Sequence, residues 1–168
     1  MYIKGVDFGP ETPMSFFSPR NRAEASDRLA GMTGWAAALA SVVYALKVLE
    51  VYAGDELAAY LNGAQLICIA LLLLVFLPAF FIVKRGFGGS LMNPLKEDGF
   101  IGLAMQRAGL TTFVATFLLL NVLTALDRLV LDHMAAEVLV DLLMAFGTAS
   151  FALSFFVFSR DSDAGEAV

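Results

Sequence analysis

Four long runs of apolar residues dominate the chain and predict four transmembrane helices. A hydrocarbon core about 30 Å thick is crossed by roughly 20 residues of helix, and each run approaches that length. The predicted spans are Ala30–Leu46, continuing to Tyr52; Leu57–Val83; Ala108–Leu126, extendable to Leu131; and Val138–Phe158. Pro78 is expected to kink the second span near one end. The expected fold class is therefore all-α, a polytopic membrane protein with four transmembrane helices arranged as two helical hairpins.

The polar segments set the predicted boundaries, with one hairpin over residues 29–85 and the other over 107–160. In the cytoplasmic N-terminal segment 1–28, Ser18 and Pro19 resemble a helix start and predict a short interfacial helix that leads into the first span. The Gly-rich segment 86–106 is expected to be a cytoplasmic loop, with room for a surface helix from Phe100 onward. The small and acidic residues 161–168 are expected to form a disordered tail.

A short internal repeat accompanies the two hairpins. Residues 30–33, Ala-Gly-Met-Thr, match residues 108–111, Ala-Gly-Leu-Thr, and the hairpins end in the similar sequences FFIVKR and FFVFSR. Two spans return the chain to the same side of the membrane, so duplicated hairpins would be parallel copies. The repeat, if it reflects a duplication, predicts a four-helix bundle with pseudo-twofold symmetry about the membrane normal.

Composition and charge support a membrane location and disfavour a nucleic-acid partner. Apolar residues make up 59% of the chain and charged residues 16%, and the mean hydropathy is +0.76. A soluble domain usually carries about 25% charged residues, so the lipid bilayer is the expected surrounding of the helices. The net charge of −5 provides no general positive field that would attract nucleic acid.

The distribution of Lys and Arg predicts the topology, because positively charged loops resist translocation. Nine of these residues fall on one predicted side: Lys4, Arg20, Arg22, Arg28, Lys84, Arg85, Lys96, Arg107 and Arg160. Both termini are therefore expected to be cytoplasmic. The pattern, with no secretory signal peptide, suits a plasma membrane and in particular a bacterial inner membrane.

No motif for catalysis, metal binding or cofactor binding is recognisable. The single cysteine, Cys68, lies in an apolar run and has no second thiol to pair with. The single histidine, His133, excludes an intrachain bis-histidine haem or a His-rich metal site. We therefore expect no cofactor, no metal and no enzymatic activity.

Polar side chains on all four spans cluster toward the predicted outer leaflet. They are Lys47, Glu50, Asn62, Gln65, Asn121, Thr124, Asp127, Arg128 and Asp141. An ionised carboxylate at this depth needs a partner, and Arg128 and Lys47 are the nearest cations to Asp141 by depth. We expect Asp141 to pair with one of them. The cluster either locks the outer ends of the helices together or forms a polar vestibule for a small solute or a partner.

Two functions compatible with this pattern remain. The middle of each span lacks ionisable side chains other than Cys68, which disfavours a proton-driven carrier. Small residues recur at i, i+4 spacing in the first span, at Ala30, Gly34 and Ala38, as in helices that pack closely. The favoured interpretation is an accessory, assembly or regulatory subunit that contacts another membrane protein, or itself, through its helices. The alternative is a small oligomeric channel or facilitator.

Overall fold

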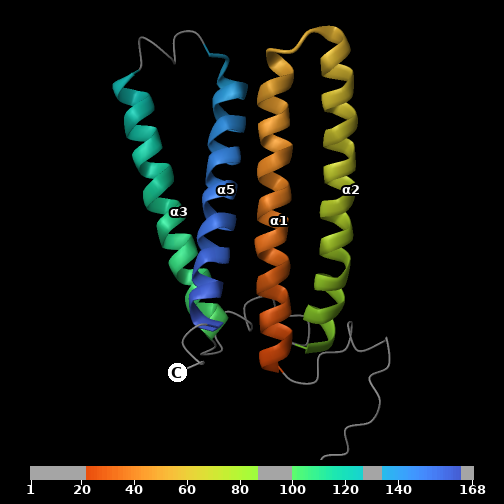
Figure 1. Ribbon diagram of the computed structural model, residues 1–168, viewed down its shortest axis with the longest axis vertical. Coiled ribbons are helices and arrows are strands. Elements are labelled where there is room, and N and C mark those ends of the chain that lie inside the picture. Colours follow the sequence, from red (N-terminus) through yellow and green to blue (C-terminus); the bar gives the residue numbers. More distant parts are fainter. Residues whose placement is uncertain (1–21, 87–99, 127–133, 164–168) are drawn as a thin grey trace, which may run out of the picture.

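The computed structural model describes residues 22–86, 100–126 and 134–163, which form four helices (Figure 1). These are α1 (Arg22–Val51), α2 (Asp55–Gly86), α3 (Phe100–Ala125) and α5 (Ala136–Asp163). Each contains a stretch of 24 to 28 residues that is long and apolar enough to cross a membrane. The described part of the chain is all-helical, which confirms the predicted fold class. The four apolar helices indicate a multi-pass membrane protein.

The two hairpins lie side by side, and the first helix of one packs against the second helix of the other. Helices α1 and α5 occupy the centre, with α2 outside α1 and α3 outside α5 (Figure 1). Helix α1 packs along both α2 and α5, and α5 packs along both α1 and α3. Contact between α1 and α3 is slight, and α2 packs extensively only against α1. The result is a four-helix bundle that stays open between α2 and α3.

A tight turn joins α1 to α2. The amide of Tyr52 donates to the Leu49 carbonyl at 3.2 Å, and the amide of Ala53 donates to the Glu50 carbonyl at 3.1 Å. Asp55 and Glu56 then occupy the first turn of α2, where carboxylates interact favourably with the helix dipole. We call this end of the bundle, at which α1 and α3 end and α2 and α5 begin, the hairpin end.

The helices extend farther than the sequence pattern indicates. Helix α1 runs without interruption from Arg22, so the predicted interfacial helix is, in its described part, the first turns of the spanning helix itself. Helix α3 begins at Phe100, where the sequence leaves room for a surface helix, and runs without interruption through Gly102 and Gly109 into the third span. Helix α5 continues to Asp163, three residues into the expected tail, and α2 remains one helix through Pro78. Residues 1–21, 127–133 and 164–168 lie outside the described parts.

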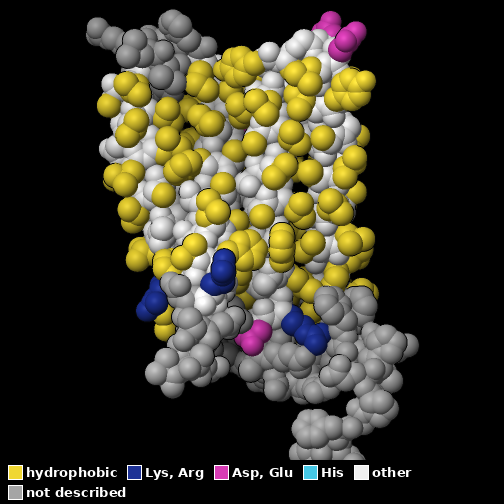
Figure 2. All heavy atoms as spheres, viewed as in Figure 1, with side chains coloured by type: hydrophobic (Ala, Val, Ile, Leu, Met, Phe, Trp, Pro, Cys, Tyr) yellow, Lys and Arg dark blue, Asp and Glu magenta, His cyan; other side chains and the backbone are white. Residues whose placement is uncertain are grey.

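Small residues form most of the helix contacts, and large apolar side chains face outward. Six of the ten buried apolar residues are alanines, whereas α2 and α3 expose many Leu and Phe side chains. Figure 2 shows this apolar surface covering the visible face, with charged side chains near its two ends. In lipid, helices gain little by hiding large apolar side chains from the solvent, so close backbone approach at small residues drives their packing.

Helices α1 and α5 approach each other closely at Gly34. Ala30 of α1 and Ala108 of α3 are buried against Phe155 of α5. A Cβ atom added at Gly34 would lie 2.6 Å from Cδ1 of Phe155, so only glycine fits there without displacing the ring. The small-residue spacing at Ala30 and Gly34 therefore serves packing within the chain.

The predicted twofold symmetry does not hold in the described helices. Under that symmetry α2 and α5 would have equivalent surroundings, but α5 packs against two helices and α2 against one. The repeated Phe-Phe pairs show the same difference, since Phe155 is 3% exposed and Phe80 is 66% exposed. On α2 the buried side chain is instead Ile82, which packs against Ala25 of α1. Helix α2 is thus turned about its axis relative to α5.

Candidate functional site

Polar side chains of three helices meet at the hairpin end. The Glu50 carboxylate of α1 accepts one hydrogen bond from Asn62 Nδ2 at 2.7 Å and another from Gln65 Nε2 at 2.8 Å, both from α2. Gln65 is the only buried polar residue in the described part of the chain. Each carboxylate oxygen of Glu50 therefore has an amide donor, and this group fastens α1 to α2.

An ion pair links the two hairpins. Lys47 Nζ of α1 lies 3.5 Å from Asp141 Oδ1 of α5, which confirms the prediction that Asp141 pairs with a cation of similar depth. The Lys47 side chain is 48% exposed and that of Asp141 is 19% exposed. Exposed ion pairs contribute little free energy, typically less than about 1 kcal/mol. This pair therefore orients the hairpins more than it stabilises them.

Helix α3 does not join this polar group in the described residues. Asn121 Nδ2 donates to the Phe117 carbonyl at 2.8 Å, and Thr124 Oγ1 donates to the Leu120 carbonyl at 2.8 Å, so both turn back on their own helix. Both side chains are exposed. Asp127 and Arg128 lie outside the described residues. The predicted cluster is thus divided into a bonded group on α1, α2 and α5 and a separate exposed pair on α3.

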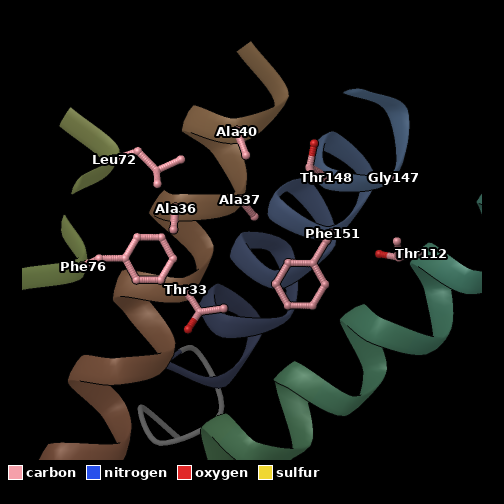
Figure 3. Close-up of a pocket in the computed structure, with 10 residues that line it drawn as sticks. All are labelled: Thr33, Ala36, Ala37, Ala40, Leu72, Phe76, Thr112, Gly147, Thr148 and Phe151. Atoms are coloured by element: carbon pink, nitrogen blue, oxygen red, sulfur yellow. The ribbon is translucent and has the colours of Figure 1, made fainter. Parts of the chain in front are cut away.

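A groove of about 430 Å³ lies farther along the bundle, on the open side between α2 and α3 (Figure 3). All four helices line it, and α1 provides most of its floor. The lining residues are Thr33, Ala36, Ala37, Ala40, Leu72, Phe76, Thr112, Gly147, Thr148 and Phe151. The rings of Phe76 and Phe151 flank it from α2 and α5. This volume is within the range of about 300–1,000 Å³ that is typical of ligand sites.

The groove presents an apolar surface although three of its residues are threonines. Thr33 Oγ1 donates to the Leu29 carbonyl at 2.8 Å, and Thr112 Oγ1 donates to the Ala108 carbonyl at 2.8 Å. Thr148 Oγ1 donates to the Met144 carbonyl at 2.6 Å. Each hydroxyl proton is thus used within its own helix. None of the ten lining residues is ionisable, so the groove suits an apolar occupant.

The sequence pattern did not single out this groove. Its only signals were the small residues of α1, among them Ala37, and the absence of ionisable side chains at this depth. Such signals do not reveal whether a small residue touches another helix of the same chain or faces an opening. That depends on the rotation of α2, which leaves Phe76 beside the groove instead of filling it.

Within the described residues, no three Cys, His, Asp or Glu side chains come together as a metal site requires. The chain matches no protein family model, no curated protein and no solved structure. The groove and the polar group at the hairpin end are therefore the features from which a function can be inferred.

Proposed function

We propose that this protein is an accessory, assembly or regulatory subunit without catalysis of its own, and that it acts through helix contacts in the membrane. The observation that carries the proposal is the apolar groove on the open side of the bundle. Its floor of Ala36, Ala37 and Ala40 lets another backbone come close, which is how helices associate in lipid. The occupant we propose is one transmembrane helix of a partner protein.

The polar group at the hairpin end weighs against the channel alternative. A vestibule that binds a solute needs polar atoms directed into the solute path. The carboxylates of Glu50 and Asp141 are instead bonded to Asn62, Gln65 and Lys47 of the same chain. These bonds account for the described carboxylates as a connection between helices. The threonine hydroxyls that line the groove are likewise bonded to carbonyls of their own helices.

For the topology, we propose that the hairpin end faces outward and that both termini are cytoplasmic, in a plasma membrane such as a bacterial inner membrane. The support is the Lys and Arg distribution, including the described Arg28, Arg107 and Arg160 at the opposite end. Single cysteines at Glu56 and Ser159, each in a Cys68→Ala background, test this. We expect an impermeant maleimide to label Glu56→Cys in intact cells and Ser159→Cys only after permeabilisation; the reverse pattern would overturn the orientation.

The test of the function is native mass spectrometry of the protein extracted from its own membrane in mild detergent. A subunit is expected to appear in a defined complex with another membrane protein. Ala37→Leu, which puts a bulky side chain on the floor of the groove and keeps another backbone away, should abolish this complex, whereas the lipid-exposed Ala70→Leu on α2 should preserve it. Thr112→Val should also preserve it, because the Thr112 hydroxyl is bonded within its own helix.

Two results would contradict this function. A partner retained by Ala37→Leu would mean that the complex forms elsewhere and that the groove holds only lipid chains. No hetero-complex, together with solute flux in liposomes that falls on neutralising Glu50 or Asp141, would favour the channel alternative.

A further inference from the structure

The side of α3 that faces away from the bundle carries a continuous stripe of exposed residues. Its members recur at helical spacing and are Gln106, Leu110, Phe113, Phe117, Asn121 and Thr124. The large side chains among them are strongly exposed, 66% for Leu110, 68% for Phe113 and 57% for Phe117. The opposite side of α3, with Ala104 and Ala108, is the side buried in the bundle. We call this exposed set the α3 stripe.

Asn121 distinguishes the α3 stripe from an ordinary lipid-facing surface. One of its two amide protons is used by the Phe117 carbonyl. The second amide proton and the Oδ1 acceptor have no partner among the described residues. A polar amide directed toward lipid is costly, and such side chains commonly hydrogen-bond between transmembrane helices. The residue therefore points to a second helix on this side.

We propose that the occupant is α3 of a second copy of this chain, in a parallel pair with a twofold axis along the membrane normal. Two copies in one membrane share the same orientation, so such an axis places each stripe residue opposite itself. An amide suits this arrangement because it carries both a donor and an acceptor. Asn121 of each copy donates its second amide proton to Oδ1 of the other. This proposal is independent of the one made for the groove.

The rest of the α3 stripe is compatible with this pairing. Gln106, a second self-complementary amide, lies at its other end. Phe113 and Phe117 stack with ring centroids 6.4 Å apart and planes 15° from parallel, which forms a flat apolar patch between the two amides. No residue from Ala108 to Leu126 is charged, so two copies meet along the span without like-charge repulsion. Thr112, which lines the groove, lies on the other side of α3 and stays accessible to a groove occupant.

Disulfide cross-linking tests the pairing with a matched control. Phe117 and Leu118 are equally exposed, 57% and 58%, but they point about 100° apart around the helix. In a Cys68→Ala background in liposomes, mild oxidation should link Phe117→Cys into dimers and leave Leu118→Cys monomeric. Equal cross-linking at both positions would indicate random collision, and no cross-linking at Phe117→Cys would indicate no pairing. Either result would overturn the proposal.

A second measurement tests the role of Asn121. Förster transfer between labelled copies, followed as lipid dilutes the protein, gives the dimer Kd. Asn121→Leu should raise this Kd roughly 3- to 30-fold, the range expected for a hydrogen bond between membrane helices. Leu118→Ala should leave it unchanged. An unchanged Kd in Asn121→Leu would overturn the assignment, and because Asn121 is lipid-exposed, the variant is expected to remain folded.

Discussion

Gly34→Ala is the most direct test of the packing between the two hairpins. The added Cβ would lie 2.6 Å from Cδ1 and 2.9 Å from Cε1 of Phe155. Favourable contacts between carbon atoms occur at about 3.5–4.0 Å, so the ring or the helix must move by about 1 Å. The ring has little freedom, because Phe155 is 3% exposed and is stacked on Phe151 with its edge toward Phe156.

The expected cost follows from this confinement. Overpacking a well-packed site costs about 1–3 kcal/mol. For a chain of this length each kcal/mol corresponds to about 2–4 °C, so the Tm should fall by about 2–12 °C. Gly31→Ala is the matched control. Gly31 lies on the same helix as Gly34, and a Cβ atom added there would meet nothing within 4 Å. The substitution should therefore be neutral or stabilise the protein by up to about 1 kcal/mol, because alanine favours helix over glycine.

Thermal unfolding of the purified protein in one detergent, followed by circular dichroism, gives both values. Phe155→Leu provides a further test, since the shorter side chain gives the new methyl group room. In the double variant, Gly34→Ala should cost less than it does alone, a coupling that a double-mutant cycle measures. Equal Tm values for Gly34→Ala and Gly31→Ala would refute the close contact, and additive effects with Phe155→Leu would refute its assignment to this ring.

Two further predictions concern the hairpin end. Asp141→Asn should lower the Tm by at most about 2–4 °C, the value of an exposed ion pair, and should lower it less in a Lys47→Met background; an equal effect in both backgrounds would remove the pairing. Glu50→Ala should cost about 1–3 kcal/mol in a denaturation series, because it leaves the buried Gln65 amide without an acceptor. Adding Gln65→Leu should recover part of this loss, and an unrecovered double variant would contradict the explanation. Glu56→Ala removes only a carboxylate of the first turn of α2 and should cost less, about 0.3–1 kcal/mol.

Much of the fold is predictable from the sequence because the bilayer imposes a strong physical constraint. Apolar runs of sufficient length must be helices, since no other single segment satisfies its backbone hydrogen bonds in lipid. That Asp141 pairs with a cation, Lys47 or Arg128, was predictable for a similar reason, and the structure shows Lys47. Both residues lie near the same end of their helices, and a carboxylate at that depth requires a nearby cation.

Helix rotation was not predictable in this way. Nearly every side of α2 and α3 is apolar, so the hydrophobic pattern does not indicate which side faces the bundle. Asn121 and Thr124 were therefore grouped with the polar residues of the other helices, whereas α3 directs them outward. The groove was not predictable either, because it depends on the rotation and position of α2. Helix α2 does not pack against α3, and the groove lies between them.

The two copies of the repeated sequence pack differently within the bundle. Ala30 and Ala108 are equivalent positions of the two hairpins, and both pack against the one ring of Phe155. A symmetric bundle would need a second ring, that of Phe80, in the matching place between α1 and α3. Helix α2 instead buries Ile82 against Ala25 and leaves Phe80 66% exposed. The groove lies about one turn farther along on the side where Phe155 packs, since Thr112 and Phe151 of its lining are each four residues from Ala108 and Phe155. The groove beside this contact, with its floor of small α1 residues, is the place that the proposed partner helix would occupy.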